Sequence, residues 1–356
     1  MNLKTILNIL AAMLVLTGLT MILPALIAWG YSEPDLAGHL KSSAICVLIG
    51  SPIWFFTRKN RSLNSKDGFV IVTLAWILIA LAGAQPFYLT GTIPNFTDAW
   101  FESMSGVTTT GASIIGNIDT LPNLVNGIES LPHGVLFWRS FIQWIGGMGI
   151  IVFTIAILPL LGVGGVQLFK AEVPGPVASK IRPRVKETAK ILWMVYVGLT
   201  VLQTLLLGIS GMPWFDSICH ALTTMPTGGF STQNASIAAY GNPVIHYVII
   251  LFMFIAGVNF SLHFRSLTGN IKISFKDPEF LAYIGITFAA TLFIFLNIAS
   301  AQGEWTHDNF LSSLFQSVSI LTTTGYGSAD YEIWPFFSQY LRSEERRVGK
   351  ECRSRW

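Results

Sequence analysis

The sequence predicts an all-α protein that crosses a membrane several times. Of its 356 residues, 52% are hydrophobic and only 12% are charged, whereas soluble domains carry about 25% charged residues. A helix needs about 20 apolar residues to cross a hydrocarbon core of about 30 Å. Seven runs come close to or exceed that length, and an eighth begins near residue 331. The seven cover residues 5–29, 40–57, 68–90, 133–162, 188–210, 242–264 and 279–299. The first run is expected to be retained, since a cleaved signal has a shorter apolar region.

Basic residues gather on one side of these predicted spans. Most of the 22 Lys and Arg residues lie near the N-terminus or in the loops 58–66, 170–190 and 265–276. Counting the spans puts these loops on the side of the N-terminus, and the positive-inside rule makes that side cytoplasmic. Acidic residues predominate on the opposite side, where they would raise the local concentration of cations. The expected protein is multi-pass with a cytoplasmic N-terminus.

Three short segments between the apolar runs end in the same way. The endings are Thr108-Thr109-Thr110-Gly111-Ala112, Thr223-Thr224-Met225-Pro226-Thr227-Gly228-Gly229 and Thr322-Thr323-Thr324-Gly325-Tyr326-Gly327. Each segment carries an acid near its start: Asp98 with Glu102, then Asp216, then Asp308. The charge pattern requires each segment to enter and leave the membrane on the outer side. Irregular backbone survives at that depth only where it lines a wet cavity or is buried in protein. The segments are therefore predicted to be re-entrant.

These segments divide the chain into repeats of helix, re-entrant pore helix with loop, and helix. Gly111, Gly228 and Gly325 are interpreted as equivalent positions. Every repeat enters from the cytoplasmic side, so the repeats are parallel and are expected to surround a central pore. The predicted parts are an N-terminal transmembrane helix pair (1–67), pore unit one (68–185), pore unit two (186–278) and an incomplete pore unit three (279–341).

The last stretch of the chain does not fit this pattern. Residues 342–356 carry nine charges and follow an apolar stretch too short to span a membrane. A charged residue at the centre of a membrane helix costs about 2.5–3.5 kcal/mol. We interpret this stretch as a tail that is not native, arising from truncation, a frameshift or a vector-derived junction. The alternative is a genuine basic cytoplasmic tail.

The Thr-Gly endings have the chemistry of a cation filter. A dehydrated cation needs oxygen ligands in place of water, and backbone carbonyls supply them in potassium channels, whose TVGYG loop differs at one position from the third ending. Glycine reaches the unusual backbone conformations required, and threonine adds a hydroxyl oxygen. Each pore helix would direct the negative end of its dipole toward the pore. The predicted ion-binding residues are Thr109, Thr110, Gly111, Ala112, Thr227, Gly228, Gly229, Thr323, Thr324, Gly325 and Tyr326.

Several of these residues also have simpler structural explanations. Turn chemistry explains a single Thr-Gly, but three on one side of the membrane favour a filter. The acids near the helix starts could cap the helices or attract ions, and both explanations stay open. Arg139 is predicted to pair with Glu102, and His220 to fill a hydrogen-bonded niche in preference to binding a metal. The three cysteines lack the spacing of a metal site or a disulfide framework.

These residues resemble the TrkH/KtrB family of bacterial potassium-uptake proteins. The marks are Trp100-Phe101-Glu102-Ser103-Met104-Ser105-Gly106 with the first Thr-Gly ending, Phe137-Trp138-Arg139-Ser140 through Gln143-Trp144-Ile145-Gly146-Gly147-Met148-Gly149, Pro226-Thr227-Gly228-Gly229-Phe230-Ser231, and the third ending. The resemblance covers about residues 1–341, and the N-terminal helix pair is closer to TrkH than to KtrB. The family also has a fourth pore loop and a Gly-rich intramembrane loop, and both would lie beyond Leu341.

The resemblance implies K⁺ uptake across the bacterial inner membrane through a backbone-carbonyl selectivity filter. K⁺ would be the metal ion bound at the residues above and the ion transported, with no cofactor in this chain. The implied partners are a second copy in a homodimer, a cytosolic nucleotide-binding regulatory subunit (TrkA-like) that gates the pore, and membrane lipid. No nucleic-acid partner is expected.

Two other functions are less consistent with the sequence. A Na⁺- or H⁺-coupled K⁺ symporter is the alternative, but carriers of that kind usually bury an ionisable residue at the midplane, and no acid stands clearly in the middle of a predicted span. An enzyme is not expected, because the sequence has no HExxH motif, no G-x-S-x-G motif and no paired intramembrane aspartates.

Overall fold

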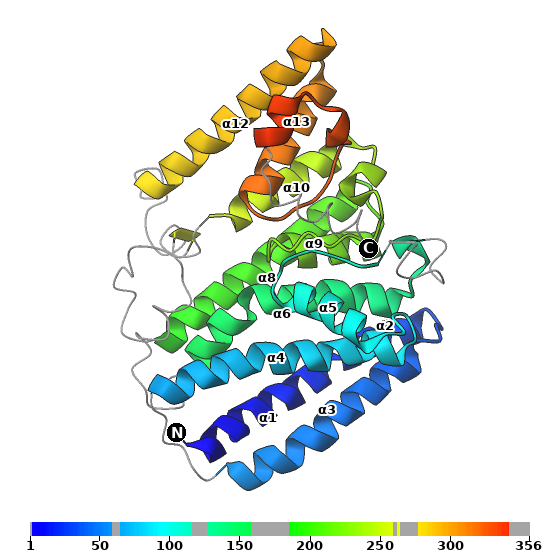
Figure 1. Ribbon diagram of the computed structural model, residues 1–356, viewed down its shortest axis with the longest axis vertical. Coiled ribbons are helices and arrows are strands. Elements are labelled where there is room, and N and C mark those ends of the chain that lie inside the picture. The colour runs from blue at the N-terminus through cyan, green and yellow to red at the C-terminus, as the bar shows by residue number, and fades with distance from the viewer. Residues whose placement is uncertain are drawn as a thin grey trace. The chain divides into compact units, whose positions relative to one another are not determined.

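The computed structural model describes residues 2–58, 65–115, 127–157, 185–258, 262–263 and 277–341 (Figure 1). Within these ranges, every regular element is an α-helix or a short 3₁₀ helix, which confirms the predicted all-α class. The predicted tail, 342–356, lies outside the described residues, as does the end of the predicted span 133–162.

Five helices are long and apolar enough to cross a membrane. They cover Leu3–Gly30, Leu36–Thr57, Lys66–Leu89, Lys190–Ile209 and Pro278–Gln302. The first combines α1 (Leu3–Thr20) with α2 (Ile22–Gly30), and the others belong to α3 (Leu36–Thr57), α4 (Ser65–Leu89), α8 (Val185–Ile209) and α12 (Pro278–Gln302). These helices confirm five of the predicted spans, and the protein is a polytopic membrane protein.

Two predicted spans differ from this pattern. Helix α6 (His133–Ile157) begins where the sequence predicted, and its predicted continuation is not among the described residues. Helix α10 (Pro243–Ala256) has 14 residues, so the prediction of one continuous helix over 242–264 is wrong. The N–H of Val258 turns to the carbonyl of Ile255, at 3.2 Å, in place of the carbonyl of Phe254.

Side chains outside α10 donate hydrogen bonds to its last carbonyl groups. The last carbonyls of a helix have no intrahelical donor and need other partners, most of all in a membrane. The Tyr283 hydroxyl of α12 donates to the Phe254 carbonyl at 3.2 Å. The imidazole Nε2 of His263 lies 2.9 Å from the Ile255 carbonyl, to which it can only donate. Tyr283 is 29 residues from Phe254 and belongs to another helix, and hydropathy alone does not reveal such a partner.

Three short helices precede the Thr-Gly endings. They are α5 (Phe96–Val107), α9 (Trp214–Thr224) and α13 (His307–Leu321), with 12, 11 and 15 residues. At 1.5 Å per residue the longest rises only about 22 Å, which is too short to cross the hydrocarbon core. The side chains of Asn95 and Thr306 cap α5 and α13 by accepting from backbone N–H groups. The acids Asp98, Asp216 and Asp308 lie in the first turns, where the helix dipole favours negative charge.

The chain folds as two compact units. The first contains Met1–Ile114 and Ser130–Met194, and the second contains Ile115–Glu129 and Val195–Trp356. In the first unit, α1, α3 and α4 lie side by side, and α5 packs between α4 and α6 (Figure 1). In the second, α13 packs against α10 and α12. The remaining elements are η1 (Ile128–Ser130), η3 (Ser236–Ala239), η5 (Tyr331–Ile333) and α14 (Phe336–Leu341). The division into four parts made from the sequence stays a prediction.

Candidate ion-binding site

All three Thr-Gly endings adopt one unusual backbone conformation. In each ending one threonine has a left-handed φ, and the glycine two residues later has one as well. The φ values are 55°, 53° and 60° for Thr109, Thr227 and Thr323, and 73°, 71° and 82° for Gly111, Gly229 and Gly325. Left-handed φ is a genuine outlier for a β-branched residue. In the described part of the chain only two other non-glycine residues share it, so this conformation marks the three endings.

This conformation corrects the register of the repeats. Gly229, and not Gly228, is equivalent to Gly111 and Gly325, because Gly228 is not among the residues with positive φ. The helix ends agree: the N–H of Thr227 bonds to the Thr224 carbonyl at 2.9 Å, as the N–H of Thr323 bonds to that of Ile320 at 2.9 Å. The predicted equivalence of Gly228 with the other two glycines is therefore wrong by one residue. The second ending contains two adjacent glycines, Gly228 and Gly229. Matching the Thr-Gly dipeptide aligned the first of them, whereas the backbone conformation aligns the second.

Hydroxyl groups tether the first and third endings in the same way. Ser105 Oγ donates to the Ala112 carbonyl at 2.6 Å, and Ser319 Oγ donates to the Tyr326 carbonyl at 2.8 Å. In addition, the hydroxyls of Thr108 and Thr110 lie 2.8 Å apart, as do those of Thr322 and Thr324. Thr108 and Thr322 donate to carbonyls of their own helices, so their partners Thr110 and Thr324 are the donors within each pair.

The second ending lacks the paired threonines. Pro226 and Gly228 occupy the positions of Thr322 and Thr324 once the register is corrected. The N–H groups of Gly228 and Gly229 both donate to the Thr223 carbonyl, at 2.9 and 3.2 Å. The second ending therefore folds back onto α9 through backbone hydrogen bonds.

The second and third endings touch within the second compact unit. A Cβ atom added to Gly229 would overlap the carbonyl oxygen of Thr324, so only glycine fits there. The Tyr326 hydroxyl reaches α9, at 2.6 Å from Thr223 Oγ1 and 3.1 Å from Thr224 Oγ1. The structure thus brings together seven predicted residues: Thr227, Gly228, Gly229, Thr323, Thr324, Gly325 and Tyr326. The other four, Thr109 to Ala112, belong to the first unit.

A polar network lies behind the second ending. His220 donates from Nδ1 to the Asp216 carbonyl at 2.8 Å, and its Nε2 is 3.0 Å from Ser231 Oγ. The Asp216 carboxylate accepts from Thr232 Oγ1 at 2.8 Å and from the Tyr240 hydroxyl at 2.9 Å. Burial raises the pKa of Tyr240, so this residue keeps the proton that it donates. The hydrogen-bonded niche predicted for His220 is confirmed. Among the described residues, no group of three or more His, Cys, Asp or Glu side chains has the arrangement of a metal site.

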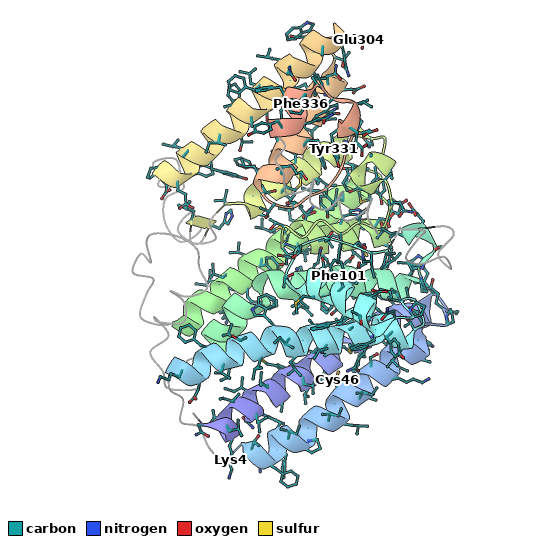
Figure 2. All side chains as sticks on the ribbon, in the orientation of Figure 1. Lys4, Cys46, Phe101, Glu304, Tyr331 and Phe336 are labelled. Atoms are coloured by element: carbon teal, nitrogen blue, oxygen red, sulfur yellow. The ribbon has the colours of Figure 1, made fainter. Side chains whose placement is uncertain are left out.

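An ion pair supports the first ending. Arg139 Nε lies 2.7 Å from Glu102 Oε1, and the two side chains are 3% and 0% exposed, which confirms the predicted pair. Glu102 also accepts from Ser113 Oγ at 2.9 Å and from the N–H of Ile114 at 3.1 Å. The pair therefore joins α5 and α6 to the residues that directly follow Ala112. Figure 2 marks Phe101, the neighbour of Glu102 on α5.

The sequence reasoning missed several residues of this site. Phe230 takes the position of Ala112 and Tyr326 in the second ending. Ser105 and Ser319, which hold carbonyls in place, were not singled out. A signal was present, because each of these serines stands at the same distance before its Thr-Thr-Thr-Gly.

The apolar spanning helices, with short helices and loops between them, define an integral membrane protein that crosses the bilayer several times. Residues 38–341 match the sequence profile of the TrkH family, described as a cation transport protein. The chain belongs to this family, which also agrees with the prediction that it is not an enzyme.

Similar proteins cover most of the chain. The Trk system potassium uptake protein TrkH of Escherichia coli K12 is 41% identical over 353 residues, which are 96% of this chain and 70% of that protein. The Trk system potassium uptake protein TrkG of the same strain is 34% identical and covers 90% of this chain and 65% of that protein. The crystal structure of the potassium transporter TrkH from Vibrio parahaemolyticus has a TM-score of 0.81 and 37% identity, covering 96% of this chain and 69% of that one.

Proposed function

We propose that the protein takes up K⁺ across the bacterial inner membrane through a filter lined by backbone carbonyls of the three Thr-Gly endings. The observation that carries this proposal is the left-handed threonine followed, two residues later, by a left-handed glycine in each ending. Similarity to Trk system potassium uptake proteins supports K⁺ as the ion. The ligands would be Thr109 to Ala112, Thr227 to Gly229 and Thr323 to Tyr326.

The backbone geometry suits this chemistry. In a strand, successive carbonyls point to opposite sides. Left-handed residues that alternate with ordinary ones turn successive carbonyls toward the same side, as a row of cation ligands requires. Each left-handed threonine also lies two or three residues beyond the C-terminus of a short helix, and the negative end of the helix dipole stabilises a nearby cation.

We infer that the membrane potential alone drives uptake. One charge moved through 100 mV gains about 2.3 kcal/mol, enough to concentrate K⁺ several tens of times. Carriers that couple transport to Na⁺ or H⁺ usually bury an ionisable residue near the midplane of the membrane. The buried carboxylate of Glu102 is already compensated by Arg139, which favours passive uptake. Clamping the potential while the Na⁺ and proton gradients are removed separately distinguishes the two, since symport stops without its gradient.

The assembly follows from the same proposal. The N-terminus would face the cytoplasm, and pore units 68–185, 186–278 and 279–341 would contribute successive walls of the pore. The chain would pair with a second copy in the lipid bilayer. A TrkA-like nucleotide-binding subunit would gate it from the cytosolic side, as the name Trk system of the relatives suggests.

The test is Gly325→Ser, measured as K⁺ uptake with Na⁺ as competitor in cells that lack their own K⁺ uptake systems. We expect lower discrimination between K⁺ and Na⁺, because a side chain at a φ of 82° displaces the carbonyls of the third ending. Gly303→Ser is the matched control: Gly303 has a φ of 70°, ends α12 and has open space around it. Unchanged selectivity in Gly325→Ser would argue against the filter.

A further inference from the structure

We infer that Tyr326 is a specificity-determining positioning residue, whose hydroxyl fixes the third Thr-Gly ending against α9 and so sets the spacing between the second and third endings. This inference rests on the proposed function, since it concerns selectivity at that filter. No ion contact is assigned to the hydroxyl itself.

The Tyr326 side chain joins two separate parts of the second unit. It is completely buried and belongs to an apolar cluster with Phe315 and Val318 of α13 and with Ile249 and Met253 of α10. Its hydroxyl lies 2.6 Å from Thr223 Oγ1, 3.1 Å from Thr224 Oγ1 and 3.2 Å from the His220 carbonyl. All three partners lie in the last turns of α9, which end within the first residues of the second ending.

The positions of the protons follow from the distances. Thr224 donates to the His220 carbonyl at 2.7 Å, and Thr223 donates to the Cys219 carbonyl at 3.0 Å. Each threonine hydroxyl has thus donated its proton, and its oxygen can only accept a further hydrogen bond. The Tyr326 hydroxyl can donate its single proton to Thr223 Oγ1 at 2.6 Å or to the His220 carbonyl at 3.2 Å, and Thr223 Oγ1 is the nearer acceptor. The short bond is therefore made by the tyrosine as donor.

The backbone of Tyr326 is held as firmly as its ring. Its carbonyl accepts from Ser319 of α13 at 2.8 Å. The carbonyl of the next residue, Gly327, accepts from the N–H groups of Ile237 and Ala238 at 3.0 and 3.1 Å. An aromatic ring is rigid, so a residue fixed at both ends acts as a spacer of constant length between α13 and α9.

The Tyr326 side chain lies close to the contact between the second and third endings. Gly229 packs against the Thr324 carbonyl, two residues before Tyr326. If the spacer were lost, the two endings could shift relative to each other, and the carbonyls could close around the smaller Na⁺. At the equivalent positions, Ala112 and Phe230 have no hydroxyl, so among the three endings only the third carries this brace.

The experiment compares Tyr326→Phe, Thr223→Val and the double variant by K⁺ uptake with Na⁺ as competitor. Tyr326→Phe removes one buried hydrogen bond while keeping the ring, and we expect a three- to tenfold loss of K⁺ selectivity. Thr223→Val removes only the nearest acceptor and should cause a smaller loss. The double variant should equal Tyr326→Phe, because the two changes break the same bond. Tyr247→Phe is the control: its hydroxyl bonds to His307 on an exposed surface of the same unit.

The outcomes separate this inference from the proposed function. If the unchanged protein does not take up K⁺, the proposed function fails. If it is selective and Tyr326→Phe is equally selective, the brace is refuted while the filter stands. Losses that add in the double variant would also refute it. Thr223→Val leaves Tyr326 itself unchanged, so it tests the brace even if Tyr326→Phe does not accumulate in the membrane.

Discussion

The second and third Thr-Gly endings reach the same backbone conformation with different supports. In the third, the hydroxyls of Thr322 and Thr324 bond to each other, and Ser319 holds the Tyr326 carbonyl. In the second, Pro226 and Gly228 stand where those threonines would be, and a network around His220 and Asp216 lies behind the loop. The shared feature is the left-handed pair of threonine and glycine. The supporting bonds differ, so similar loops can be built from sequences that align poorly.

The largest effect is expected from a substitution at the contact between the second and third endings. Gly229→Ala places a methyl group onto the Thr324 carbonyl and strains a φ of 71°. Backbone must move in both endings, so we expect K⁺ uptake to be lost. Gly211→Ala is the control, since its φ of 95° is equally unfavourable for alanine but no atom lies near the added methyl. Normal uptake by Gly229→Ala would mean that the two endings do not form one filter.

The first ending differs from the other two because a buried ion pair, Arg139 with Glu102, holds the residues that follow it. Arg139→Gln leaves the carboxylate of Glu102 buried without its charge partner, a change that typically costs about 3–5 kcal/mol. We expect a lower melting temperature of the purified protein and less protein in the membrane. Glu102→Gln combined with Arg139→Gln should recover much of the stability. A double variant as unstable as the single one would show that charge burial is not the cause.

Removing one hydroxyl from each support gives smaller effects. Ser319→Ala frees the Tyr326 carbonyl, and we expect the KM for K⁺ to rise about two- to tenfold, the effect of one hydrogen bond. Ser231→Ala removes a hydroxyl that bonds to His220, behind the second ending, so its KM should change less. Uptake kinetics at equal protein abundance measure both. An equal rise in the two variants would contradict the difference described above.

The smallest expected effect concerns Tyr240 at high pH. Burial raises the pKa of this tyrosine above its usual value near 10. Above that pH the unfolded chain loses the proton while the folded protein keeps it, so the free energy of unfolding falls as the pH rises. Tyr240→Phe should reduce this decline. Thermal unfolding at several pH values above 9, compared with the unchanged protein, measures it, and parallel curves would exclude a contribution from Tyr240.

Much of this architecture was predictable because it depends on local patterns. Apolar length identified five spans, and acidic starts with Thr-Gly endings identified the short helices. The pair of Glu102 and Arg139 followed from a lone arginine and a nearby acid. Pairwise chemistry of this kind can be read from residue types.

The errors arose where distant residues decide the local structure. Helix α10 ends early with Tyr283 and His263 at its last carbonyls, and neither is adjacent in sequence. The register of the second ending depends on which of two glycines has the left-handed φ. The bond between Tyr326 and Thr223 joins residues far apart in the chain. Hydropathy and motif spacing contain no information about such pairs.

The left-handed threonines have a consequence for transplanting these loops. A non-glycine residue in this conformation costs on the order of 1–3 kcal/mol, and it persists only where the surroundings impose it. Thr109, Thr227 and Thr323 each adopt it. A synthetic peptide with the sequence of one ending would relax to another shape, and a graft into a foreign scaffold would fail unless the helix and the hydrogen-bonding neighbours were carried with it. The unit that can be moved between proteins is therefore the whole helix-and-loop hairpin with its anchors.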